Sequence, residues 1–131
     1  MNWLAIICAA AAYWILGAIW YMALFGKIWA AAIEEHGVKL QRSGMAAKMI
    51  GNFLCNLVAA IIMARLIQRI GAKPDILRGM RLGAGMAVGF SATALTIQYL
   101  WESKPSKVWL IDVSYHFFGC IALGAILAMW K

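Results

Sequence analysis

An acid, a phenol and an imidazole that lie close together in an apolar segment are the residues of this sequence best suited to chemistry. Tyr115 and His116 follow Asp112 by three and four residues, which places all three on one face of a helix. A carboxylate inside a membrane span costs about 2.5–3.5 kcal/mol at the helix centre and less near the interface, so it calls for an explanation. The functional interpretation is a proton or cation site at Asp112, with His116 as a relay and Tyr21 or Tyr115 as a hydrogen-bond donor.

Asp112 also has a structural interpretation. It lies in the second turn of its predicted helix, where the helix dipole still slightly favours an anion. It could bond His116 or Asn52 and lock the helices together. His116 alone could ligate haem, but nothing in the chain supplies a second ligand. The sequence has no phosphate loop, nucleophile elbow or metal-ligand pair. A membrane enzyme is therefore the weaker alternative, and we expect no catalytic residue, cofactor or metal.

Polar residues of the other apolar segments fall at a matching depth. Asn52 and Asn56 are one helical turn apart, Trp20 and Tyr21 stand near the end of the first segment, and Gln98 stands near the end of the third. From the rise per helical residue, these groups occupy a layer roughly 6–13 Å inside the same membrane boundary. We therefore expect one shared polar pocket. Its predicted members are Asp112, His116, Tyr115, Tyr21, Trp20, Asn52, Asn56 and Gln98.

The composition predicts the elements that must position these residues. Of 131 residues, 65% are hydrophobic and only 13% are charged, whereas soluble domains have about 25% charged residues. A bilayer core about 30 Å thick needs about 20 apolar residues per helix, so the chain can hold four spans. We predict an all-α polytopic membrane protein, with an up-down bundle of four transmembrane helices in one domain over residues 1–131. The predicted spans are 2–25, 45–70, 79–101 and 105–130.

The connections between the spans are short. The first span carries no charged residue and is too long for the apolar core of a signal peptide, so we expect it to be retained. The first loop, residues 26–44, is the longest and is expected to contain a short amphipathic interfacial helix. Gly71 and Pro74 predict a turn in the second loop. Pro105 suits the first turn of the last helix.

The charge pattern indicates a lipid bilayer as the partner. The net charge is +7, but the basic residues lie between apolar runs and beside Trp and Tyr, which favours anionic lipid headgroups over nucleic acid. Six basic residues fall at each end of the bundle. The end with the first and third loops has Lys27, Lys39, Arg42, Lys48, Lys104 and Lys107, and the other end has Arg65, Arg69, Lys73, Arg78, Arg81 and Lys131. Because the second loop is denser in charge and the N-terminal amine joins it, we expect both termini in the cytoplasm, in the cell (inner) membrane.

Small residues predict close helix packing in the third span. Gly79, Gly83, Gly85 and Gly89 form overlapping ladders with four-residue spacing, which let helix backbones approach closely. They are also a candidate interface for a homo-oligomer. The three cysteines lie in apolar runs without Cys-x-x-Cys spacing, so neither a disulfide framework nor a zinc site is indicated.

Several motifs across the chain are those of a known family. They are Gly17-x-x-Trp20-Tyr21, Phe25-Gly26-Lys27-x-Trp29, Ala92-Thr93-Ala94-Leu95, Leu110-Ile111-Asp112-x-x-Tyr115-His116 and Gly124-Ala125-Ile126-Leu127. With these motifs, the sequence resembles the small bacterial and archaeal membrane proteins known as domain of unknown function 1761. Met22-Ala23-Leu24 stands where that family usually has a proline. The resemblance implies four membrane helices and no assigned activity.

Two functions from different classes remain open. The first is a small binding or transport protein for a proton, cation or small polar solute, with the first loop as a lid and a homo-oligomer as the conducting form. The second is a non-catalytic accessory subunit of a larger membrane complex, in which the polar layer only holds the helices together. The substitution Asp112→Asn separates them, because it preserves shape and removes charge.

Overall fold

The computed structural model describes residues 1–40, 43–71 and 75–130, and these residues form helices and loops without a strand. Four helices among them are long and apolar enough to cross a membrane. They run over Trp3–Leu24, Met45–Ile70, Ile76–Glu102 and Ser106–Met129. The predicted all-α membrane architecture is therefore confirmed, and the helices begin and end close to the predicted spans. The charges of Arg42, Lys73 and Lys131, and the centre of the predicted turn at Pro74, lie outside the described residues.

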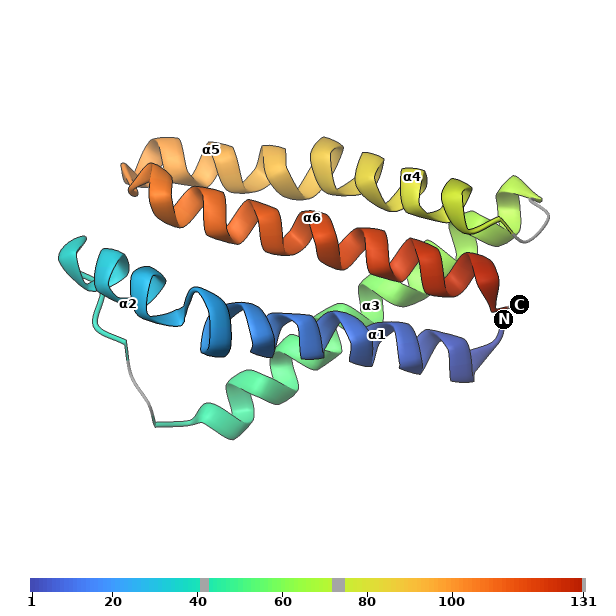
Figure 1. Cartoon of the computed structure of the whole chain (residues 1–131), viewed down its shortest axis with the longest axis horizontal. Coiled ribbons are helices and arrows are strands. Elements are labelled where there is room, and N and C mark those ends of the chain that lie inside the picture. The colour runs from blue at the N-terminus through green and yellow to red at the C-terminus, as the bar shows by residue number, and fades with distance from the viewer. Residues whose placement is uncertain (41–42, 72–74, 131) are drawn as a thin grey trace.

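The helices alternate in direction, and both termini lie at the same end (Figure 1). α1 (Trp3–Ala18) and α3 (Met45–Ile70) form the first hairpin, and α4 (Ile76–Met86) and α6 (Ser106–Met129) belong to the second. α6 packs against α1 and α4 and, less extensively, against α3. α3 crosses α1 at an angle, and its N-terminal part diverges from the other helices (Figure 1). We call the end with both termini the terminal end, and the opposite end the first-loop end.

The first and third spans each contain a π-helical segment. η1 (Ile19–Leu24) follows α1, and η2 (Ala87–Ala92) separates α4 from α5 (Thr93–Glu102). π-helical turns inside α-helices are rare and often mark functional sites. The helix is interrupted at Phe25 although no proline is present, and a Cβ at Gly26 would overlap the Tyr21 carbonyl oxygen. Glycine is therefore required where the chain turns from η1 into the next helix.

The helix expected in the first loop is α2 (Gly26–Glu35). It continues beyond α1 in roughly the same direction (Figure 1) and packs against α6. Its buried residues Ala32 and Ile33 join Tyr99 and Val108 in a small cluster at the first-loop end. This cluster fixes α2 over the start of α6, so α2 is part of the packed structure rather than a helix lying apart from it.

The glycines of the third span are used in two different ways. Gly79 and Gly83 are buried against α6, where an added Cβ would overlap the carbonyl oxygens of Gly124 and Cys120. By contrast, Gly85 and Gly89 have no such neighbour within 4 Å. The expectation that Gly79 and Gly83 form an interface between copies is therefore corrected. α6 of the same chain already occupies them, because only glycine lets the two backbones approach so closely.

Candidate functional site

The Asp112 carboxylate is the centre of a hydrogen-bonded site at the first-loop end. The Tyr21 hydroxyl donates to Oδ1 at 2.5 Å, and the Trp29 indole Nε1 donates to the same oxygen at 3.1 Å. The Tyr99 hydroxyl donates to Oδ2. An ionised carboxylate only accepts hydrogen bonds, and all three partners are uncharged donors. We call Asp112, Tyr21, Trp29 and Tyr99 the carboxylate node.

The node joins four separate helical segments. Tyr21 belongs to η1, Trp29 to α2, Tyr99 to α5 and Asp112 to α6. Trp20 adds a further tie, because its Nε1 donates to the backbone carbonyl of Ile111 at 3.1 Å. The π-helical turn thus carries two neighbouring side chains that both bond α6. The packing of α2 and α5 over the start of α6 brings the other two donors to the same carboxylate.

A second polar pair lies one turn further along α6. The Tyr13 hydroxyl and His116 Nδ1 are 2.5 Å apart, and the tautomer of the imidazole decides which of them donates. His116 does not bond Asp112. Between the two lies Tyr115, whose ring centroid is 5.3 Å from those of Tyr21 and Tyr13 and 4.8 Å from that of His116. The node and the Tyr13–His116 pair are therefore connected through the Tyr115 ring.

The structure brings together most of the residues predicted for one pocket, but not all of them. Asp112, Tyr21 and Trp20 meet as expected. Gln98 instead bonds Glu102 at 3.1 Å on the exposed side of α5. Successive residues of a helix point in directions about 100° apart, so Tyr99 faces α6 while Gln98 points away. Asn52 is exposed on the diverging part of α3.

Sequence reasoning missed three aromatic members of the site. Trp29 stands in one of the family motifs, but it lies in the first loop, outside the predicted spans and the predicted polar layer. Tyr13 has a recognisable signal, since Tyr13, Gly17 and Tyr21 follow one another at four-residue steps and share a helix face. No sequence pattern identifies Tyr99. It is the neighbour of Gln98, and the sequence does not show which of the two faces the other helices.

The groups able to hold a metal are dispersed. In the described part of the chain, no three His, Cys, Asp or Glu side chains come together. The ion pair between Lys104 Nζ and Glu102 lies at the surface, with the atoms 2.6 Å apart. Exposed pairs of this kind contribute about 0–1 kcal/mol. The chemistry that the site offers is therefore that of a carboxylate, phenols and an imidazole.

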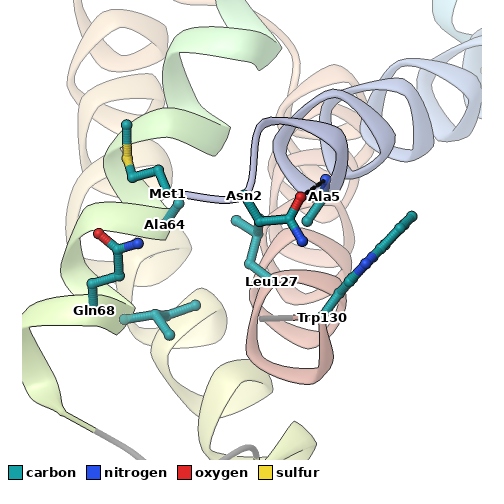
Figure 2. Close-up of a pocket in the computed structure, with 8 residues that line it drawn as sticks. Met1, Asn2, Ala5, Ala64, Gln68, Leu127 and Trp130 are labelled. Carbon is teal, nitrogen blue, oxygen red and sulfur yellow. Dashed lines mark hydrogen bonds between the residues drawn. The ribbon is translucent and has the colours of Figure 1, made fainter.

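Among the cavities formed by the described residues, two lie at opposite ends of the molecule. One of about 190 Å³ lies beside the node and is lined by Thr96, Tyr99, Leu100, Lys104, Ser106 and Trp109. The other, of about 320 Å³, lies at the terminal end between α1, α3 and α6 (Figure 2), with Met1, Gln68 and Trp130 among its lining residues. Its Asn2 side chain caps α1 by accepting from the Ala5 amide. The first cavity shares Tyr99 with the node, so it is the one placed to serve Asp112.

Removing the Trp29 donor should loosen α2. The substitution Trp29→Phe keeps an aromatic ring but deletes a hydrogen bond to a carboxylate, which is worth about 1.5–3 kcal/mol. We expect faster hydrogen exchange of the α2 amides, measured by mass spectrometry on the purified protein. The matched control is Ile28→Ala, which alters a half-exposed neighbour on the same helix and should leave exchange unchanged. Equal exchange in both variants would mean that the indole does not anchor α2.

The comparisons with known proteins agree with this architecture. The family described as "Protein of unknown function (DUF1761)" matches residues 4–128. No curated protein and no solved structure matches the chain. Because the match covers nearly the whole sequence, the chain belongs to this family, as its motifs indicated.

Proposed function

We propose that this member of the DUF1761 family is a small membrane binding or transport protein that takes up and releases a proton at Asp112. One observation carries the proposal. The carboxylate lies in a helix apolar enough to span a membrane, and it accepts hydrogen bonds from Tyr21, Trp29 and Tyr99. Ionisable residues inside membrane spans are costly and commonly mark ion or proton pathways.

A proton suits this site better than a larger ligand. Three protein groups already surround the carboxylate, so a solute or hydrated cation would have to displace them. A proton requires only that one hydroxyl reverse its role, and the tyrosine hydroxyl both donates and accepts. Tyr99 is the natural group to do so, since it also lines the 190 Å³ cavity at the first-loop end.

His116 offers a second group for the same proton. Its imidazole can carry a proton on either ring nitrogen, and Nδ1 already shares a hydrogen bond with Tyr13. The pair lies one turn deeper along α6 than Asp112. We therefore assign Asp112 the role of the outer proton site, and His116 with Tyr13 the role of the inner one.

A non-catalytic accessory subunit is the second candidate. It is favoured by the observation that the same hydrogen bonds tie η1, α2 and α5 to α6. In that case the node has only a structural role, because networks of buried polar groups rigidify helical bundles. A structural role requires only the shape and hydrogen-bonding capacity of the Asp112 side chain, whereas proton exchange requires its carboxylic acid.

Proton flux into liposomes separates the two candidates. The purified protein is reconstituted with a pH-sensitive dye inside the vesicles, and a potassium diffusion potential drives proton movement. We expect flux for the native protein and the level of empty vesicles for Asp112→Asn, with unchanged helix content and elution volume. Gln98→Leu is the matched control, because Gln98 lies outside the node, and it should retain flux. Equal flux for Asp112→Asn and the native protein would favour the accessory subunit.

A further inference from the structure

Two buried polar groups between α1, α3 and α6 have no hydrogen-bond partner. Within the described residues, they are the Asn56 side-chain nitrogen and the Tyr115 hydroxyl. The two side chains are only 5% and 4% exposed. Nine in ten or more buried polar groups are paired with protein or ordered water, because leaving one unpaired costs about 1–3 kcal/mol. Two such groups together therefore indicate a binding site.

The position of Tyr115 relates this site to the rest of the polar layer. Its hydroxyl lies against α1, where a Cβ on Gly17 would be 2.9 Å away. Its ring contacts Tyr21 of the node on one side and Tyr13 of the histidine pair on the other. The unpaired hydroxyl therefore stands between the two groups to which we assign proton binding.

Asn52 gives this site an opening. Asn52 and Asn56 both lie near the Tyr115 hydroxyl, although neither forms a hydrogen bond with it. Asn56 is buried, whereas Asn52 is exposed. Asn52 lies one turn nearer the first-loop end, in the N-terminal part of α3 (Met45–Ile70). This part of α3 diverges from the other helices (Figure 1). The exposed Asn52 side chain therefore lies between the diverging end of α3 and the buried pair of Asn56 and Tyr115.

We infer that Asn52, Asn56 and Tyr115 bind water and form a hydrated site that links Asp112 with His116. The amide nitrogen of Asn56 donates, and the Tyr115 hydroxyl donates and accepts, so a small ligand that both accepts and donates hydrogen bonds satisfies both groups. Water meets these requirements, and it bonds about three buried polar groups in typical protein sites. This inference rests on the proposed function, since it supplies the path by which a proton passes between the two sites.

Cysteine accessibility tests the hydrated site independently of proton flux. In a background with Cys8→Ala, Cys55→Ala and Cys120→Ala, the variant Asn56→Cys is treated in liposomes with 2-aminoethyl methanethiosulfonate, and labelling is followed by mass spectrometry. The control is Ala60→Cys, one turn deeper on the same face and 0% exposed. Because only the thiolate reacts and it forms only where water reaches, we expect Asn56→Cys to label at least about tenfold faster.

A second pair of variants protects the test against misfolding of Asn56→Cys. Asn52→Cys should label faster than Ile50→Cys, because Ile50 is exposed on the same apolar membrane-spanning helix but does not belong to the hydrated site. Equal labelling within both pairs would overturn the hydrated site. Tyr115→Phe should also slow proton flux while retaining helix content, and unchanged flux would overturn the link. If the native protein shows no flux but Asn56→Cys labels rapidly, the hydrated site stands and the proposed function fails.

Discussion

Asp112→Leu should unfold the first-loop end of the bundle, whereas Asp112→Asn should leave it folded. Leucine removes the acceptor of three partly or fully buried donors, on Tyr21, Trp29 and Tyr99. At about 1–3 kcal/mol for each stranded group, the loss is roughly 3–9 kcal/mol. Removing the charge recovers at most about 2.5–3.5 kcal/mol of insertion cost. The lost hydrogen bonds outweigh the recovered insertion cost, and a net destabilisation of about 3 kcal/mol follows.

Asparagine avoids that loss because an amide can satisfy the same partners. Its oxygen can accept from Tyr21 and Trp29, and its nitrogen can donate to the Tyr99 hydroxyl after that hydroxyl turns. We expect a change below about 1 kcal/mol. Both variants would be measured by unfolding in mixed micelles with increasing dodecyl sulfate, followed by circular dichroism. Equal destabilisation by leucine and asparagine would mean that charge, rather than hydrogen-bonding capacity, holds the node together.

A methyl group at Gly83 should separate α4 from α6. The Cβ of Gly83→Ala would overlap the backbone carbonyl oxygen of Cys120, and a helix backbone cannot move aside as a flexible side chain can. Overpacking of this kind costs about 1–3 kcal/mol and occasionally more. We expect a lower thermal midpoint in detergent, measured by the temperature at which the monodisperse chromatographic peak is lost.

Gly85→Ala is the matched control for Gly83→Ala. It lies on the same helix, half a turn away, and nothing stands within 4 Å of its added Cβ. Alanine is also about 1 kcal/mol better than glycine in an exposed helix position. The control should therefore be neutral or slightly stabilising. A fall in thermal midpoint for Gly85→Ala as large as that for Gly83→Ala would point to an outward interface, as the glycine ladder alone suggests.

The carboxylate node also explains why α2 and the π-helical segment η1 belong to the candidate site. Without η1 and α2, Asp112 would have only Tyr99 as a side-chain donor among the hydrogen bonds found. The helix α2 contacts the carboxylate through one indole, so the Trp29 hydrogen bond is the contact that anchors α2 to the node. The exchange measurement on Trp29→Phe examines that anchor directly.

The sequence by itself determined the four apolar helices, their alternating direction and the family. Long apolar runs can satisfy their backbone groups in a bilayer only as helices, so composition and length were sufficient. The sequence also singled out Asp112, because a carboxylate in such a run is costly wherever it faces. The pairing of Asp112 with Tyr21 was accessible as well, since alternating helices bring the end of the first span to the start of the last.

Only the tertiary structure decided which aromatic residues complete the site. Tyr99 rather than Gln98 faces α6, and the rotation of a helix about its axis depends on packing that local sequence does not encode. His116 bonds Tyr13 rather than Asp112, because residues four apart on one helix can both turn to partners on another. Gly79 and Gly83 pack within the chain while Gly85 and Gly89 do not, although all four fit the same ladder. Spacing fixes a depth and a helix face, but the neighbours across that face are set by how the helices pack.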